Sequence, residues 1–188
     1  MKKRKLVLIS GLITAGKTTS SHELIKVLPG WVFIDIWKIK EMFEPLALKD
    51  RTKLIDISKE AVLTITKKVM KDLGTNIILQ EAKSDYIKKK LGKEIKKYNY
   101  EVYSFFLKNN FKDAIKRDKR REKETLGIPK NGWSEKDWEE KAKTKTLKGD
   151  IAINTSEKSL KDVVKIMLKS IKEKPKKNPH AKKIRKSW

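Results

Sequence analysis

Short apolar runs alternate with longer amphipathic stretches along most of the chain. Five of these runs are rich in Val, Ile, Leu and aromatic residues. They cover residues 5–10, 31–35, 76–80, 101–107 and 150–154. Short, mostly apolar runs of this kind are typical of strands that are buried on both faces of a parallel sheet. The pattern therefore predicts five strands.

Segments with the helical spacing of apolar residues lie between and after these runs. The predicted helices cover residues 18–28, 39–46, 53–74, 85–99, 111–127 and 159–174. Gly74 is placed to end the third of them. Strands that alternate with helices predict a doubly wound α/β fold, in which ligands bind at the carboxyl ends of the strands.

The composition indicates one domain followed by a basic tail. We assign residues 1–172 of the 188 to the domain. Residues 173–188 contain prolines and many lysines but no apolar periodicity, so we expect a flexible tail. The chain has no cysteine and only two histidines, which excludes thiol chemistry and argues against a zinc site. No segment has the apolar length of a membrane span, and we expect a cytoplasmic protein.

The net charge of +24 has two interpretations. It can attract a polyanion, such as nucleic acid or a highly phosphorylated substrate. It can equally reflect a composition biased toward Lys, Ile and Asn. Lysine is far commoner than arginine, whereas residues that read phosphate groups are often arginines with their forked donors. The charge alone leaves both interpretations open.

The junction between the first strand and the first helix carries the most specific motif. Residues 11–18 read GLITAGKT and match the phosphate-binding pattern G-x-x-x-x-G-K-[ST]. Backbone N–H groups of such a loop surround phosphate oxygens, and Lys17 reaches the β- and γ-phosphates of ATP. The Thr18 hydroxyl can bind Mg²⁺. The residues predicted to contact the nucleotide are Gly11, Thr14, Ala15, Gly16, Lys17, Thr18 and Thr19.

Two carboxylates follow predicted strands and should lie at the same edge as the phosphate loop. Asp35 ends the second strand, where it can orient an acceptor hydroxyl and take its proton, or simply cap the next helix. Glu81 follows the third strand, where it can bind the water shell of Mg²⁺ or share the role of base. Gln80 beside it can form a hydrogen bond with a substrate. Glu81 and Gln80 can also be an ordinary solvated strand end.

Arginines cluster after the fourth strand. Arg117 and Arg121 are four residues apart and therefore share one face of a helix. Their guanidinium groups can neutralise the charge of a phosphoryl group during transfer. The segment that follows, to about residue 141, indicates a short lid that excludes water. The alternative is an exposed helix held by salt bridges.

Taken together, these motifs resemble the P-loop kinases of the nucleoside and nucleotide kinase-like group. That group includes adenylylsulfate kinase, shikimate kinase, chloramphenicol phosphotransferase and polynucleotide kinase domains. The resemblance covers residues 4–172, although only the phosphate loop is highly specific. It implies a three-layer α/β/α sandwich with a parallel five-stranded sheet of order 2-3-1-4-5 and an arginine-bearing lid at about residues 117–141. It also implies that residues 154–156 lie near the adenine.

The sequence departs from this group at two positions. Many members have Asp or Asp-Gly where this chain has Gln80 and Glu81, and several place Arg where it has Lys38. These departures leave the acceptor open. The function expected is transfer of the γ-phosphoryl group of ATP to a hydroxyl or phosphate acceptor, with a small metabolite or nucleotide favoured. The alternatives are a polynucleotide 5′-hydroxyl kinase and a non-catalytic, ATP-dependent protein that binds nucleic acid through the basic surface and tail.

Overall fold

The structure is a computed structural model that describes residues 3–42, 51–80, 84–124, 135–143, 146–147 and 149–173. Three parts of the predicted site and domain plan lie outside these residues. They are Glu81, residues 125–134 of the predicted lid and the tail beyond residue 173. The Arg121 side chain also lies outside the described part of the chain.

Five parallel strands form one sheet in the order β2-β3-β1-β4-β5. The strands are β1 (Arg4–Gly11), β2 (Val32–Asp35), β3 (Ile77–Gln80), β4 (Tyr100–Lys108) and β5 (Asp150–Asn154). All five predicted strands are present, and the strand order implied by the family resemblance is confirmed. Because β1 lies in the centre, its carboxyl end is flanked by the ends of β3 and β4.

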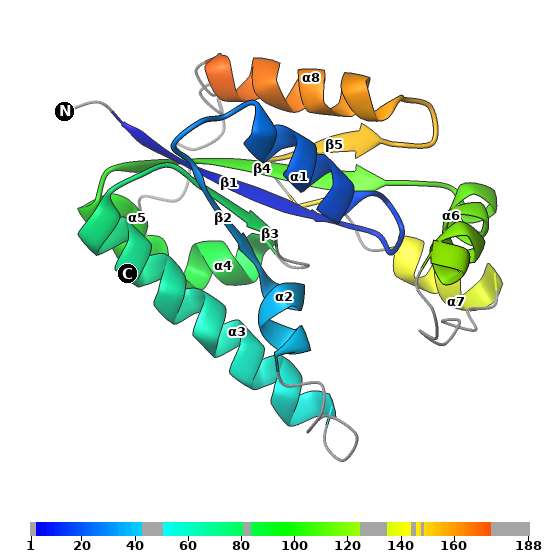
Figure 1. The fold of residues 1–188 in the computed structure, drawn as a ribbon, viewed down its shortest axis with the longest axis horizontal. Helices are drawn as coiled ribbons and strands as arrows, with labels where there is room; N and C mark the ends of the chain where they lie inside the picture. The colour runs from blue at the N-terminus through cyan, green and yellow to red at the C-terminus, as the bar shows by residue number, and fades with distance from the viewer. Residues whose placement is uncertain are drawn as a thin grey trace, which may run out of the picture.

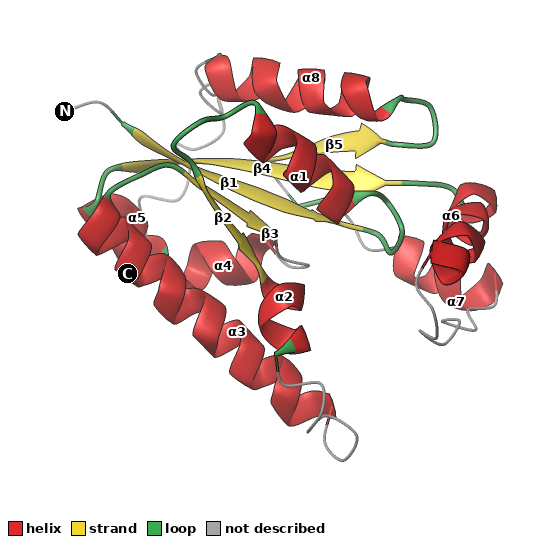
Figure 2. Cartoon of the chain, in the orientation of Figure 1, coloured by secondary structure: helices red, strands yellow, loops and turns green. Residues whose placement is uncertain are grey.

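Helices cover both faces of the sheet (Figures 1 and 2). One face carries α1 (Lys17–Lys26) and α8 (Leu160–Lys172), and the other carries α3 (Arg51–Lys68), α4 (Ser84–Lys90) and α5 (Gly92–Lys97). The short π-helix η2 (Val69–Leu73) continues α3. The remaining helices, α2 (Ile36–Glu41), α6 (Phe111–Glu124) and α7 (Glu135–Ala142), lie toward the carboxyl ends of the strands. Within the described ranges, no helix combines the length and apolarity needed to cross a membrane.

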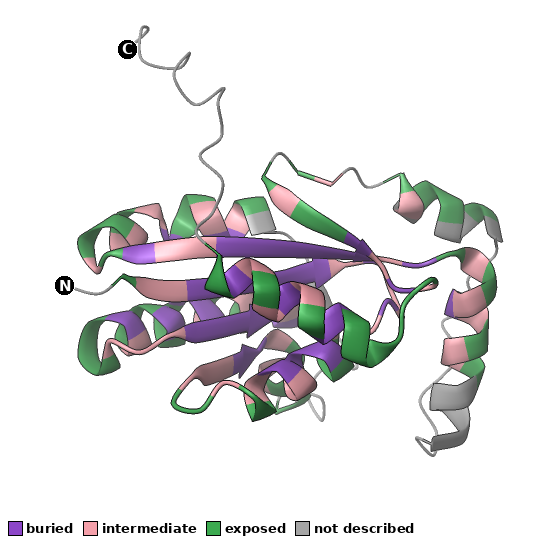
Figure 3. Ribbon diagram, turned by 90° about the horizontal axis from the view of Figure 1, so that it is seen from above, coloured by how far each residue is buried: buried purple, intermediate pink, exposed green. Residues whose placement is uncertain are grey.

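Successive side chains of β1 point to opposite faces of the sheet and pack in two separate halves of the core. Val7 and Ile9 pack in the cluster beneath α1 and α8, whereas Leu6 and Leu8 pack in the cluster beneath α3, α4 and α5. Successive side chains of a strand point to opposite faces, so a strand with helices on both sides must be apolar at every position. Figure 3 shows the resulting concentration of buried residues in the central strands.

Two predicted helices differ from the observed ones. The helix expected from residue 39 already begins at Ile36, because the Asp35 carboxylate caps it directly after β2. The helix expected over residues 85–99 is divided into α4 and α5 at Leu91, which is fully buried in the core. The chain bends there so that both α4 and α5 contact the sheet.

Gly11 must be a glycine because the ends of β1 and β4 approach each other closely. A Cβ atom at this position would lie 2.2 Å from the carbonyl oxygen of Leu107, and the backbone φ is +145°. We expect Gly11→Ala to lower the free energy of unfolding by about 3 kcal/mol or more, measured by urea denaturation.

Gly92→Ala is the matched control for this substitution. Gly92 begins α5, and among the described residues no atom beyond its chain neighbours and its own helix backbone lies within 4 Å of the position that its Cβ would occupy. We expect the free energy of unfolding of this variant to stay within about 1 kcal/mol of the unaltered protein. Similar losses in the two variants would contradict the close approach at Gly11.

Candidate active site

The phosphate loop connects β1 to α1 and opens onto the first turn of the helix. Gly16 is the N-cap of α1, with φ +83°, and none of the described side chains caps this helix. The Leu12 N–H group donates to the carbonyl oxygen of Leu107 at 2.9 Å, which ties the start of the loop to β4. A helix start without a capping side chain presents backbone N–H groups and the positive end of the helix dipole. The loop is therefore suited to hold an anion.

The Lys17 ammonium group lies against its own loop. Its Nζ donates to the carbonyl oxygens of Gly11 and Leu12 at 3.0 and 2.8 Å. These contacts hold the positive charge beside the start of α1, where an anion would bind. The contact of Lys17 with the β- and γ-phosphates stays a prediction.

Thr14 adopts a left-handed backbone conformation in the middle of the loop, with φ +55°. Asn109, which directly follows β4, supports it. The Asn109 amide Nδ2 donates to the Ile13 carbonyl and to the Thr14 hydroxyl, both at 3.2 Å. A non-glycine residue in this conformation costs free energy, so it needs support from the surrounding structure. No pattern in the sequence predicts this role for Asn109.

Arg117 connects α6 to two loops of the site. Its Nη1 donates to the Thr14 carbonyl at 3.2 Å and to the Thr155 hydroxyl at 2.9 Å, and its Nη2 donates to the Thr155 carbonyl at 2.7 Å. Thr155 belongs to the segment that the family resemblance places near adenine. The guanidinium group therefore lies between the phosphate loop and the loop after β5.

Asp35 lies at the end of β2 and is 7% exposed. Its Oδ1 accepts a hydrogen bond from the Trp37 N–H group at 2.9 Å, so the carboxylate caps α2. Burial raises the pKa of the Asp35 carboxyl above its ordinary range, although the Trp37 N–H group and the charges of His22 and Lys38 act in the opposite direction. The capping bond engages one carboxylate oxygen and fixes the orientation of the group.

Gln80 lies beside Asp35 at the end of β3. The two residues are register partners, and Ile9 of β1 pairs with Gln80 on its other side. The Gln80 Nε2 donates to the Thr18 hydroxyl at 3.0 Å. Its Oε1 is buried and has no hydrogen-bond partner among the described residues. The sequence predicts a substrate contact for Gln80 but not its pairing with Thr18.

The residues around Thr18 fit a magnesium ion. Mg²⁺ prefers oxygen ligands and is usually held by few protein groups together with substrate phosphates. Thr18, an exposed residue at the start of α1, offers its hydroxyl, and Gln80 offers an amide oxygen without a partner among the described residues. Within the described ranges, no cluster of three His, Cys, Asp or Glu side chains could hold a metal on its own. A Mg²⁺ ion here would therefore depend on the nucleotide as well as on Thr18.

The sequence matches no protein-family model and no curated protein, but the structure is similar to solved ones. A protein of Chloroflexus aurantiacus that is considered a kinase has a TM-score of 0.70 at 15% identity, over 89% of this chain and 98% of its own. The tunicamycin resistance protein of Deinococcus radiodurans has a TM-score of 0.64 at 14% identity, with coverages of 89% and 95%. The APS kinase of Mycobacterium tuberculosis, solved with AMPPNP and APS, has a TM-score of 0.57 at 12% identity, with coverages of 92% and 100%.

The chain has the fold of the P-loop kinases. This fold extends over nearly the full length of the compared structures. At this level of identity the likeness concerns the fold alone, and a function must be argued from the residues of the site.

The contacts of Arg117 predict a loss of order at both loops when it is replaced. We expect Arg117→Ala to speed backbone hydrogen exchange at residues 13–15 and 155–156, because three hydrogen bonds are lost. Arg117→Lys should restore little of the protection from exchange, since one ammonium group cannot replace the forked donors of the guanidinium group. Lys116→Ala, an exposed position on the same helix, is the control, and equal exchange in both alanine variants would contradict the connecting role.

The raised pKa of Asp35 predicts a pH-dependent difference in stability between the unaltered protein and Asp35→Asn. An asparagine caps a helix about as well as an aspartate, so the variant keeps the capping bond and loses the buried charge. At neutral pH we expect Asp35→Asn to be the more stable of the two.

The sign of this difference follows from proton linkage. The native carboxyl binds its proton more tightly than the unfolded one, so the unaltered protein gains relative stability as the pH falls through the raised pKa. The gap should therefore close toward acid pH in denaturation experiments. A gap that widens as the pH falls would show that the native Asp35 pKa is lowered.

Proposed function

We propose that the protein is an ATP-dependent kinase that transfers the γ-phosphoryl group of ATP to a hydroxyl or phosphate acceptor. One observation carries this proposal. The phosphate loop, the buried carboxylate of Asp35 and the Thr18–Gln80 pair share one edge of the sheet. Kinase chemistry needs a phosphate cradle, a magnesium ligand and a group that receives the acceptor proton, and the residue types at this edge suit all three roles.

In the proposed reaction the phosphate loop holds the nucleotide, with contacts from the loop N–H groups and Lys17. Asp35 orients the acceptor and takes its proton. A bond forms between the acceptor oxygen and the γ-phosphorus, and the bond from phosphorus to the bridging oxygen breaks, so ADP leaves with that electron pair. Thr18 and the nucleotide would hold Mg²⁺, which would supply positive charge to the phosphate oxygens. Glu81, which follows Gln80, is proposed to bind its water shell.

The proposed roles of the two lid arginines differ. Arg117 anchors α6 between the phosphate loop and the loop after β5, through its contacts with Thr14 and Thr155. Arg121, one helical turn further along, is then the candidate for neutralising the charge of the transferring group. We propose that α6, α7 and the residues between them act as the lid.

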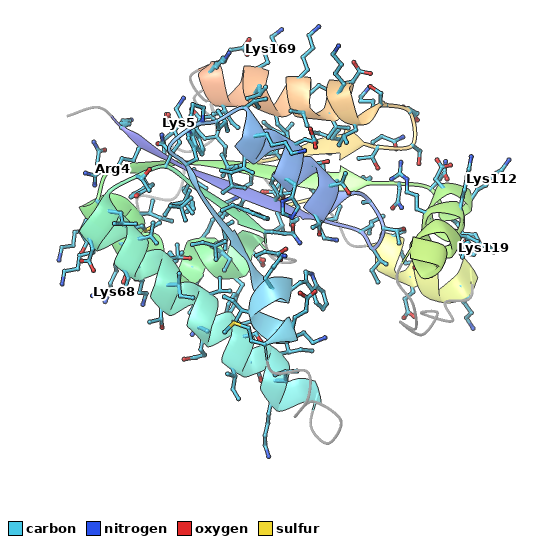
Figure 4. The ribbon with its side chains drawn as sticks, in the orientation of Figure 1. Arg4, Lys5, Lys68, Lys112, Lys119 and Lys169 are labelled. Atoms are coloured by element: carbon cyan, nitrogen blue, oxygen red, sulfur yellow. The ribbon has the colours of Figure 1, made fainter. Side chains whose placement is uncertain are left out.

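A small metabolite or nucleotide is the favoured acceptor. Basic side chains are spread over several elements, as Figure 4 shows for Arg4 and Lys5 of β1, Lys68 of α3, Lys112 and Lys119 of α6, and Lys169 of α8. A nucleic-acid site would be expected to gather such charges along one face. We propose that residues 173–188 are accessory to catalysis and that the protein acts in the cytoplasm.

The net charge of +24 supports a second candidate, a polynucleotide 5′-hydroxyl kinase. A third is a non-catalytic protein whose binding of nucleic acid depends on ATP. Phosphoryl transfer from labelled ATP to a small-molecule panel and to a 5′-hydroxyl oligonucleotide separates all three. For the second, removal of residues 173–188 should also weaken oligonucleotide binding and make its dependence on salt shallower.

Two substitutions test the proposed chemistry. We expect Lys17→Ala to lower kcat by about 100-fold to 1000-fold, because charge stabilisation is the main task of the site. Asp35→Asn should lower kcat by about 100-fold or more while the affinity for ATP changes little, since it keeps the capping bond but not the base. Both are measured by steady-state turnover and by nucleotide-binding calorimetry.

Lys26→Ala is the matched control, because Lys26 lies at the far end of the same helix and its side chain is 67% exposed. It should keep normal turnover. A folded Lys17→Ala protein with full activity would refute the kinase proposal. Full activity of Asp35→Asn would leave Asp35 with its capping role alone.

A further inference from the structure

Gln80 has an arrangement that hydrogen bonding alone does not explain. Its side chain is almost completely buried, with the residue 1% exposed. One end of the amide donates to Thr18, while the other end, Oε1, has no partner among the described residues. Buried acceptors of this kind are rare because the loss of water is not compensated. An unpaired acceptor beside the phosphate loop therefore points to a second bonding state of the amide.

The direction of the hydrogen bond determines what the Thr18 hydroxyl can do. A hydroxyl has one proton and two lone pairs. When Gln80 Nε2 donates to it, one lone pair is used and the proton has to find an acceptor elsewhere. If the amide turned so that Oε1 faced Thr18, the amide would accept the proton and both lone pairs would be available to a cation. The second state thus leaves both lone pairs for a metal ion, whereas the first leaves only one.

The neighbour of Gln80 explains why a neutral side chain is suitable here. Asp35 is its register partner on β2 and is itself buried. A carboxylate at position 80 would place two like charges side by side in a region of low dielectric, which is unfavourable. An amide offers an oxygen acceptor to the Thr18 proton without adding that second negative charge.

We propose that Gln80 is a positioning residue that couples metal binding to the phosphate loop. Its amide donates to the Thr18 hydroxyl in the free protein and turns to accept the Thr18 proton when the magnesium nucleotide binds. The inference rests on the proposed function, because it assumes that the site holds a magnesium nucleotide. The new element is that an uncharged side chain controls the Thr18 hydroxyl.

Binding of ADP to the full chain tests this proposal without any turnover. Calorimetry in excess Mg²⁺ and in EDTA gives two dissociation constants, and their ratio measures how much the metal tightens binding. Gln80→Met keeps the volume and removes both hydrogen-bonding ends. We expect it to reduce the ratio about tenfold while the constant in EDTA stays within about twofold.

Gln80→Glu should change the ratio of the two dissociation constants in the opposite sense. Its carboxylate offers only acceptors to the Thr18 proton and adds a negative charge. We expect the ratio to rise about tenfold. Ser104→Ala is the control, because the Ser104 hydroxyl in β4 is also buried without a partner in the described part of the chain. Its ratio should equal that of the unaltered protein.

The outcomes separate the inference from the proposed function. An unchanged ratio in a folded Gln80→Met protein overturns the positioning role. If that variant does not fold, the Gln80→Glu protein decides, and a ratio that does not rise overturns it. If the unaltered protein binds ADP equally tightly in Mg²⁺ and in EDTA, the positioning role of Gln80 is also overturned. The proposed binding of a nucleotide would still stand in that case. Absence of ADP binding in both conditions would refute the proposed function and the inference with it.

Discussion

The close approach of β1 and β4 at Gly11 is the constraint on which the site depends. Backbone atoms of Leu107 occupy the space that a side chain at Gly11 would need, and the Leu12 N–H group donates to the Leu107 carbonyl. The chain therefore leaves the sheet at a fixed point and turns over its carboxyl edge. Because α1 begins only a few residues later, the same contact decides where the helix start and Lys17 lie.

The loop is supported from outside the sheet as well. Asn109, which directly follows β4, and Arg117 of α6 donate hydrogen bonds to the strained Thr14 segment. Arg117 also donates to Thr155 after β5. A movement of α6 would therefore change the phosphate side and the predicted adenine side together. In a kinase, this would couple closure of the lid to the seating of the nucleotide, since one guanidinium group serves both loops.

Much of the fold could be predicted from the sequence, because apolar runs and a contiguous motif are local signals. The strands and the phosphate loop belong to this class, and the strand order followed from the family resemblance. The contacts that complete the site are not local. Gln80 and Thr18 are 62 residues apart, and Arg117 and Thr14 are 103 residues apart. Their residue types suit many partners, so only the folded sheet determines which ones meet.

Asp35 shows why a strand end cannot be assigned from its residue type alone. The sequence allowed a base or a helix cap, and the structure shows the cap, which does not exclude the base. Capping holds the carboxylate in one orientation, and burial raises its pKa, which makes it a stronger proton acceptor when it is ionised. Because Gln80 beside it is uncharged, the Asp35 pKa is not raised further, as a second acid at that position would do. The cap thus fixes the carboxylate, and the burial that destabilises its charge makes it more basic.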